Sequence, residues 1–235
     1  MRVSALAAAI ALAVTAALPL GASTAATASA APPTCADLSG VLDAAQNCRI
    51  QATDPAYSLD ITFPATYPDQ KPLFDYVRQT RDGFLNVAKA PGPHERPYEL
   101  DTTAAQYGSA VPPRGTQSVV LTTFSDVGGA HPQTYYQSFT WDQGYRKPIT
   151  IDTLFREGTQ PFGVILPIVT AELSKQSGQP VVIPPGVGLD PQTYQNFAIT
   201  NDSLIFFFSQ GTLLPEAAGA VEVTVPRGPV DAMIA

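Results

Sequence analysis

Hydrophobic and polar positions alternate, or recur at helical spacing, along most of the chain, and these patterns predict a series of short elements. Leu59, Ile61 and Phe63 alternate with polar residues until Pro64, which predicts a short strand. Between positions 71 and 90 the apolar residues return at helical spacing, which predicts an amphipathic helix packed on a sheet (Leu73, Phe74, Val77, Phe84, Leu85 and Ala88).

In the next part of the chain the pattern predicts a strand over 98–109, a rigid turn at 111–115 and then a hairpin. The hairpin strands, 119–124 and 134–141, alternate around Gly128 and Gly129. The further elements are an extended piece over 149–155, a helix over 161–178 that Gly178 caps, a hairpin of 197–200 and 204–209, a strand over 221–225 and a short terminal helix after Pro229.

Two helices against antiparallel hairpins predict an α+β protein with a β-rich C-terminal half. The continuous apolar run Leu204–Phe208 predicts a strand buried on both faces, with the helix over 161–178 on one side. An exposed aromatic strip is the alternative. If alternate residues of 134–141 face outward, tyrosine lies at the surface, which makes Tyr135 and Tyr136 candidate partner contacts.

Residues 1–30 predict a cleaved secretory signal. Arg2 precedes an apolar run to Leu20, and Ala28-Ser29-Ala30 forms an Ala-x-Ala site, so we expect cleavage after Ala30. An uncleaved membrane anchor is the alternative. Cleavage removes one base, Arg2, and no acid, so the formal net charge falls from −7 to −8. This charge argues against a nucleic-acid partner and permits a basic protein partner.

Both cysteines, Cys35 and Cys48, follow the predicted cleavage site. An even number of cysteines in an exported chain predicts one structural disulfide. A redox-active pair is the alternative, but the spacing is far from Cys-x-x-Cys. Because the chain has no Cys/His cluster, we expect neither zinc nor any other cofactor.

Catalytic motifs are absent from the sequence: it has no Gly-x-Ser-x-Gly elbow, Walker loop or dinucleotide fingerprint. Only His94 and His131 could serve a Ser-His-Asp triad. His131 follows Ser125 and Asp126 closely, but a structural role in its turn is the simpler interpretation, and partner contact is the next. The acids that a glycosidase would need are scattered singly (Asp142, Asp152, Glu157, Glu172 and Glu216).

Six segments carry a resemblance to a known family: 67–71, 112–117, 128–132 (GGAHP), 141–143, 145–150 and 204–226 (LIFFFSQGTLLPEAAGAVEVTVP). From about Cys35 to the C-terminus the chain resembles the secreted mycobacterial immunogenic proteins of the MPT sixty-four type. From about Thr116 it is also similar to the extracellular domain of lysozyme-sensing anti-sigma factors, a domain of unknown function, in which a Gly-Gly-Ala-His turn and a Phe-rich strand recur.

These patterns and resemblances together predict four parts. They are a cleaved signal (1–30), a disulfide-pinned arm (31–57), an N-terminal α/β subdomain (58–111) and a C-terminal domain of the anti-sigma-factor extracellular type (116–235). Unlike those sensors, the chain predicts no membrane-spanning segment after the signal.

The resemblances imply a secreted, non-enzymatic binding protein that acts at the cell envelope or on host molecules. The second one implies a basic partner such as lysozyme, which the negative charge would steer. We expect a monomer with a host or envelope protein as its partner, and no nucleic acid. The alternatives are an esterase or glycan hydrolase with an unrecognised site, and a membrane-surface lipid-binding protein, although the acidic charge predicts weak lipid binding.

Overall fold

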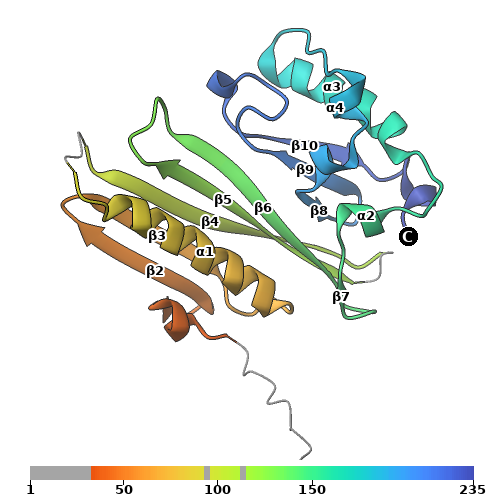
Figure 1. Cartoon of the computed structure of the whole chain (residues 1–235). Coiled ribbons are helices and arrows are strands. Elements are labelled where there is room, and N and C mark those ends of the chain that lie inside the picture. Colours follow the sequence, from red (N-terminus) through yellow and green to blue (C-terminus); the bar gives the residue numbers. More distant parts are fainter. Residues whose placement is uncertain (1–32, 93–95, 112–114) are drawn as a thin grey trace, which may run out of the picture. The chain divides into compact units, whose positions relative to one another are not determined.

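The computed structural model describes residues 33–92, 96–111 and 115–235. The predicted signal with its cleavage site at Ala30, and also His94, lie outside the described residues. The described chain forms one seven-stranded and one three-stranded sheet with two main helices, which confirms the predicted α+β class (Figure 1).

The seven-stranded sheet follows the order of the chain. Its strands are β1 (Val41–Leu42), β2 (Asn47–Asp54), β3 (Tyr57–Pro64), β4 (Tyr98–Ser109), β5 (Thr116–Asp126), β6 (Gln133–Asp142) and β7 (Lys147–Pro148). Neighbours are antiparallel except β3 and β4, which are parallel and joined through helix α1 (Gln70–Ala88). A parallel pair needs such a crossover because a tight turn cannot reverse the chain twice.

The three-stranded sheet has the order β10-β9-β8. Its strands are β8 (Phe197–Ile199), β9 (Ser203–Phe208) and β10 (Val221–Pro226), and its helix is α3 (Pro161–Ser177). The shorter pieces are α2 (Ile151–Leu154), α4 (Pro185–Gly188) and the 3-10 turns η1 (Cys35–Leu38), η2 (Pro191–Tyr194), η3 (Glu216–Ala218) and η4 (Asp231–Met233).

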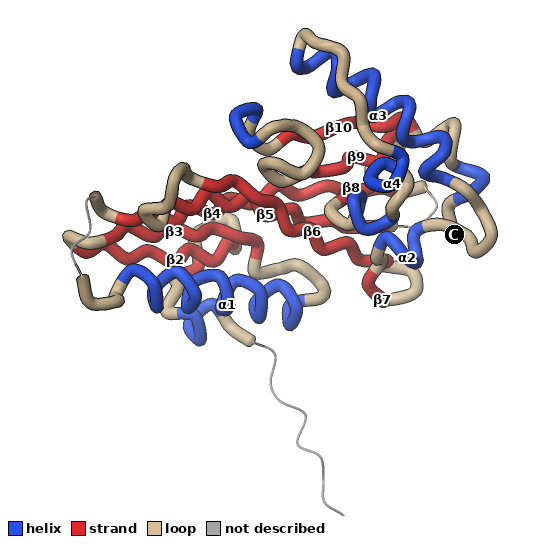
Figure 2. Tube along the Cα trace, turned by 45° about the horizontal axis from the view of Figure 1, so that its top comes forward, coloured by secondary structure: helices blue, strands red, loops and turns tan. Residues whose placement is uncertain are grey.

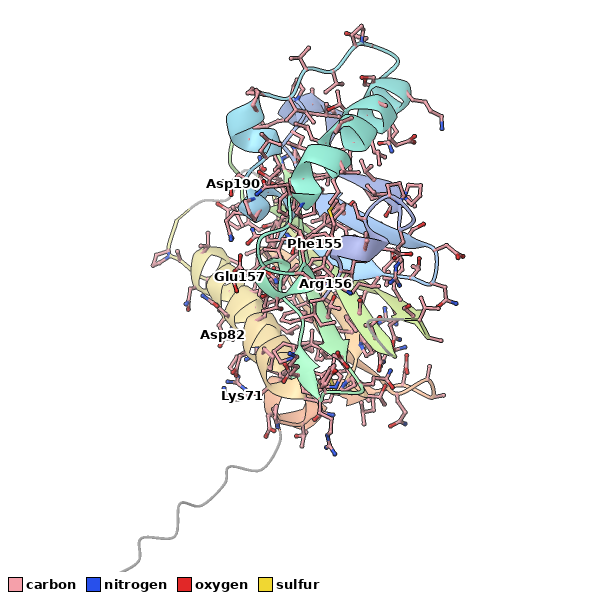
Figure 3. The ribbon with its side chains drawn as sticks, turned by 90° about the vertical axis from the view of Figure 1, so that its right-hand side faces the viewer. Lys71, Asp82, Phe155, Arg156, Glu157 and Asp190 are labelled. Carbon is pink, nitrogen blue, oxygen red and sulfur yellow. A yellow bond between two sulfur atoms is a disulfide. The ribbon has the colours of Figure 1, made fainter. Side chains whose placement is uncertain are left out.

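Helix α1 covers one face of the seven-stranded sheet (Figure 2). Phe74 of the helix meets Phe63 of β3 edge to face, with ring centroids 5.0 Å apart. The other buried contributors are Leu73, Val77 and Phe84 from the helix and Leu59, Ile61, Leu100, Val119 and Leu121 from the sheet. Lys71 and Asp82, labelled in Figure 3, lie on the exposed side of the same helix.

The three-stranded sheet is covered on both faces. Phe206 and Phe208 pack with Tyr194 and with the buried residues of α3, Ile165, Val169 and Leu173. Phe207 packs in the opposite direction, against the Tyr107 and Tyr136 rings of the seven-stranded sheet. The prediction that Leu204–Phe208 is a strand buried on both faces is therefore confirmed.

Most predicted elements are confirmed, and one prediction is wrong. Residues 149–155 do not continue as an extended piece, because Thr150 and Thr153 form a capping box that starts α2: the Thr150 N–H donates to Thr153 Oγ1 at 2.9 Å. Both predicted hairpins are antiparallel, and the sheet also contains one parallel pair, β3 with β4, that the sequence did not predict. The predicted turn at 111–115 includes residues 112–114, which lie outside the described residues, while β4 and β5 on either side of it belong to the same sheet. The domain limits at 31–57, 58–111 and 116–235 stay predictions.

A disulfide joins Cys35 of η1 to Cys48 of β2, as the sequence predicts. Gly40 packs against it so closely that a Cβ there would lie 2.7 Å from both sulfur atoms, so only glycine fits. Because β2 pairs with β3 along eight residues, the bridge ties the first described turn to the sheet.

Candidate functional site

The two segments that identify the chain most clearly, 128–132 and 204–226, meet in space. His131 Nε2 lies 2.7 Å from Glu216 Oε2, and His131 Nδ1 lies 3.0 Å from Nε2 of the Gln133 side chain. Gln210 reinforces the contact, because its Oε1 accepts from the Thr134 N–H at 3.0 Å and its own N–H donates to the Thr134 carbonyl at 2.9 Å. The sequence singled out both segments without predicting that they touch.

The turn that carries His131 depends on Gly128. This residue has φ of 75°, in the left-handed region, and its N–H donates to Asp126 Oδ1 at 3.1 Å. A Cβ at this position would lie 2.7 Å from the Tyr98 ring, so the close approach also demands glycine. The turn is thereby fixed between β5 and β6.

The surroundings of His131 do not form a catalytic triad in the described parts of the chain. A triad needs the histidine between a carboxylate and a serine hydroxyl. Here Glu216 occupies one ring nitrogen and Gln133 the other, and no described serine bonds to the ring. The side chains of His131 and Glu216 are also 47% and 53% exposed, so the pair is a surface contact.

A metal site is likewise absent from the described residues, and two acidic residues serve turns. No group of three His, Cys, Asp or Glu side chains there could hold a metal ion. Asp142, one of the scattered acids, is buried and accepts from the Tyr145 N–H at 2.8 Å, as expected of a turn residue. Asp190 caps η2 in the same way. No helix of 33–92, 96–111 or 115–235 is long and apolar enough to span a membrane.

Tyr135 and Tyr136, the other candidate contacts, lie on opposite faces of β6. Tyr135 lies on the α1 side and hydrogen-bonds Thr123, whereas the Tyr136 ring lies 5.3 Å from Phe207. Both are half-buried, and burial raises the pKa of both hydroxyls. Their roles, and that of His131, in partner contact stay predictions.

The outer edge of β6 is held by side chains that sequence reasoning missed. Asn196 Oδ1 accepts from the Ser138 N–H at 2.9 Å, and Ser209 Oγ accepts from the Tyr136 N–H at 3.0 Å. Together with Gln210, these residues satisfy backbone donors that β7 is too short to reach, because β7 pairs only with Trp141 and Asp142. Their only signal in the sequence is that they flank apolar strands.

A second feature is the part of the seven-stranded sheet, on the side away from α1, that lies beyond the packing of Phe207 on Tyr107 and Tyr136. Over β2, over β3 as far as Thr62 and over β4 as far as Thr103, the residues that alternate with the core residues point away from α1 and are exposed or half-buried. We call this region and its rim the acidic sheet face, which comprises Arg49, Gln51, Ser58, Asp60, Glu99, Asp101, Thr103, Phe124 and Asp126.

Like charges lie opposite one another on the acidic sheet face. Asp60 is the register partner of Asp101, and Glu99 that of Asp126. Arg49 bonds Asp60 at 2.8 Å and so holds the pKa of that carboxyl below its usual value, while Arg96 bonds the Asp126 carboxylate at 3.0 Å. Glu99 and Asp101 have no cationic partner among the described residues.

Comparison with known proteins first shows which class of protein this chain resembles. Residues 152–228 match the family described as "Protein of unknown function (DUF3298)". Solved members from Bacteroides fragilis and Pseudomonas aeruginosa superpose with TM-scores of 0.53 and 0.50 at 14% and 11% identity. The alignments cover 80% and 83% of this chain and 92% and 96% of theirs. This likeness shows the fold, which is that of DUF3298 proteins.

Closer relatives then define the particular family. Immunogenic protein MPT64 of Mycobacterium tuberculosis and immunogenic protein MPB64 of Mycobacterium bovis are each 57% identical over 209 residues, covering 88% of this chain and 91% of theirs. The chain belongs to the MPT64/MPB64 family of immunogenic proteins, which confirms the predicted resemblance. A further relative, named esterase Rv3036c of Mycobacterium tuberculosis, is 51% identical over 203 residues, covering 86% of this chain and 89% of its own length.

Proposed function

We propose that this protein is an exported, non-enzymatic binding protein that uses its acidic sheet face to bind a basic protein. The observation that carries the proposal is the two pairs of like-charged neighbours, Asp60 with Asp101 and Glu99 with Asp126, in a part of the sheet where Asp60, Glu99 and Asp101 are exposed or half-buried. The Cys35–Cys48 disulfide supports export, because such bridges persist in oxidising compartments.

Like charges opposite each other on a sheet cost stability. Lys and Arg side chains of a partner would remove that cost, since they would supply the cations that Glu99 and Asp101 lack among the described residues. The formal net charge of −7 adds long-range attraction, which speeds encounter with a basic protein. A lysozyme-like protein is such a partner.

The test is calorimetric titration of the chain from residue 31 onward with lysozyme at low and at physiological salt. We expect saturable binding that the double substitution Glu99→Gln/Asp101→Asn weakens about tenfold at low salt. Glu157→Gln/Asp202→Asn is the matched control, because it removes the same charge from exposed positions outside the acidic sheet face (Glu157 is labelled in Figure 3).

Equal weakening by both double variants would mean that only net charge matters, and absence of binding would mean that lysozyme is the wrong partner. Unchanged affinity in Glu99→Gln/Asp101→Asn would place the binding surface elsewhere. Each of these results overturns the proposal as stated.

An esterase is the second candidate, favoured by the relative that carries that name and by the His131–Glu216 pair. A histidine bonded to a carboxylate is the pair that a general base requires. Under our proposal, hydrolysis of p-nitrophenyl acetate and butyrate by the wild type will equal that of His131→Ala and Glu216→Gln. Turnover that both variants abolish, but that Asp202→Asn retains, would establish the esterase instead.

A further inference from the structure

A cavity of about 330 Å³ lies against the middle of β6, apart from the His131 contact and the acidic sheet face. Its wall is built by the residues before α1, by the segment from β7 into α2, and by η2 with the start of β8. This volume is at the lower end of the range for small-ligand sites. Phe139 and Ile149 supply apolar parts of the wall.

Asp69 is a half-buried carboxylate that lines this cavity and lacks a compensating group. It occupies the N-cap position of α1, yet its side chain makes no capping hydrogen bond, and no described residue bonds it elsewhere. Burial raises its pKa, which is the effect expected of a carboxylate with no nearby cation.

Tyr67 adds an independent polar group to the same wall. Only 1% of the residue is exposed, and its ring packs 6.4 Å from that of Phe139. No described residue hydrogen-bonds its hydroxyl. Within the described ranges, Thr116 Oγ1 is the only side-chain nitrogen or oxygen atom that is both shielded from solvent and without a hydrogen-bond partner. The Tyr67 hydroxyl also lacks a partner, so it belongs to the small part of Tyr67 that solvent reaches. A hydroxyl that reaches solvent and has no partner in the protein is available to donate to or accept from a ligand.

The cavity wall also carries a second carboxylate, Asp152, and the side-chain amides of Gln192 and Gln195, for which no described residue is a hydrogen-bond partner. Its other polar lining residues are Gln137, Ser138, Thr140 and Thr150. No Lys, Arg or His lines the cavity. Two carboxylates without a cation repel an anionic ligand, whereas a positively charged donor gains both hydrogen bonds and Coulomb energy.

We propose that this cavity binds an organic cation, a guanidinium or ammonium group that bonds Asp69 and Asp152 and donates to the Tyr67 hydroxyl. The Phe139 side of the wall packs against the carbon stem of the ligand, as apolar surfaces do with the stems of Arg and Lys. The same chemistry is carried by a free amine and by a basic side chain of a peptide. The site goes beyond the protein-binding function proposed above and uses none of its residues.

The experiment follows amide signals of the ¹⁵N-labelled chain from residue 31 onward by NMR during titration at pH 7. Agmatine represents the free cation, acetyl-Gly-Arg-Gly-amide the peptide side chain, and the citrulline peptide of the same length a neutral isostere. We expect saturable shifts at the Gln192 and Gln195 side chains with at least one cationic probe and none with the neutral one. Tighter binding of agmatine identifies a free amine as the source, and tighter binding of the peptide identifies a side chain.

Asp69→Asn keeps the size of the side chain and should weaken binding of the cation about tenfold, and Tyr67→Phe should weaken it less. Asp101→Asn is the matched control and should leave this affinity unchanged. Absence of binding by both cations, equal binding of the citrulline peptide, or unaltered affinity in Asp69→Asn would each overturn the proposal. Asp69→Asn should bind lysozyme as the wild type does. Titration of this variant with lysozyme therefore distinguishes failure of the cation site from failure of the proposal for the acidic sheet face.

Discussion

The seven-stranded and three-stranded sheets each pack against one long helix, but they differ in what lies on the other face. Behind α3, the three-stranded sheet meets the second sheet through Phe207, so β9 is buried on both sides. On the side of the sheet away from α1, strands β2 and β3 and the first part of β4 carry exposed or half-buried charged and polar side chains. The sequence records this difference as a continuous apolar run in β9 and as alternation in β3.

This difference separates the residues that stabilise the fold from the residues that are free to bind a partner. A strand buried on both faces has every side chain committed to packing, whereas a strand buried on one face offers every second side chain to a partner. Substitutions should therefore cost far more in β9 than on the acidic sheet face.

The largest effect should come from Phe206→Ala. Phe206 is 0% exposed and contacts Tyr194, so truncation leaves a cavity and should lower the free energy of unfolding by about 3–5 kcal/mol. The same truncation at half-buried Phe124, on the acidic sheet face, should cost about 1 kcal/mol. Urea unfolding of both variants checks the comparison, and equal losses would show that the two faces do not differ as described.

The next effect concerns the start of the seven-stranded sheet. Replacing both Cys35 and Cys48 by serine removes a bridge that spans 13 positions and should cost about 3 kcal/mol on the chain-entropy model. In native-state hydrogen exchange the extra opening should be confined to η1, β1 and β2. Faster exchange of β9 amides by a local route would contradict the separation of the two regions, because β9 lies in the other core.

An intermediate effect is expected where the two regions join. Asn196→Ala leaves the Ser138 N–H without its acceptor and should cost about 1–3 kcal/mol. Asn201→Ala, which removes a similar bond to the Ala110 N–H at an exposed position, should cost less, about 0.5–1 kcal/mol. If thermal unfolding ranks the two variants in the reverse order, the junction is not held as we describe.

Smaller changes of the opposite sign are expected on the acidic sheet face. Glu99→Gln/Asp101→Asn removes like-charge repulsion and should raise stability by about 0.2–1 kcal/mol in low salt. The gain should shrink in 1 M salt, where exposed charges are screened. A loss of stability, measured by chemical denaturation, would mean that these carboxylates have partners that the described residues do not supply.

The smallest effect should be the pH dependence contributed by Asp69. Because its pKa is raised in the folded protein, the folded state holds the proton more tightly, and the charged form costs stability above that pKa. Asp69→Asn should therefore stabilise the protein slightly at pH 7 and give no gain at pH 3, where both states are protonated. A stabilisation that is the same at both pH values would contradict this cause.

The sequence predicted the strands and helices that have strong apolar patterns, but it could not predict every pairing. Strand β2 was not predicted because Cys48 and Ile50 are its only fully buried residues, which are too few for a clear alternation of apolar and polar positions. The parallel pairing of β3 with β4 depends on where α1 delivers the chain, which no local pattern records. The helical start at Ile151 was missed because the Thr150–Thr153 capping box lacks the usual Glu or Gln.

The candidate sites were less predictable than the fold, because each joins residues from distant segments. His131 and Glu216 were noted separately, and only the fold puts them 2.7 Å apart. The cavity combines Tyr67 and Asp69 with Gln192 and Gln195, none of which belongs to a chemical motif. The acidic sheet face was accessible in principle, since Asp60, Glu99 and Asp101 sit at polar positions of alternating strands, but it required the register to bring them together.

The bonds along the outer edge of β6 have a consequence for how copies of this chain behave toward one another. A strand edge with free backbone donors is a template on which another polypeptide can add a strand. Here Asn196, Ser209 and Gln210 occupy that template with side chains from the same molecule. Substitutions that remove these three side chains would expose a β-edge. We expect such variants to self-associate and aggregate at high concentration.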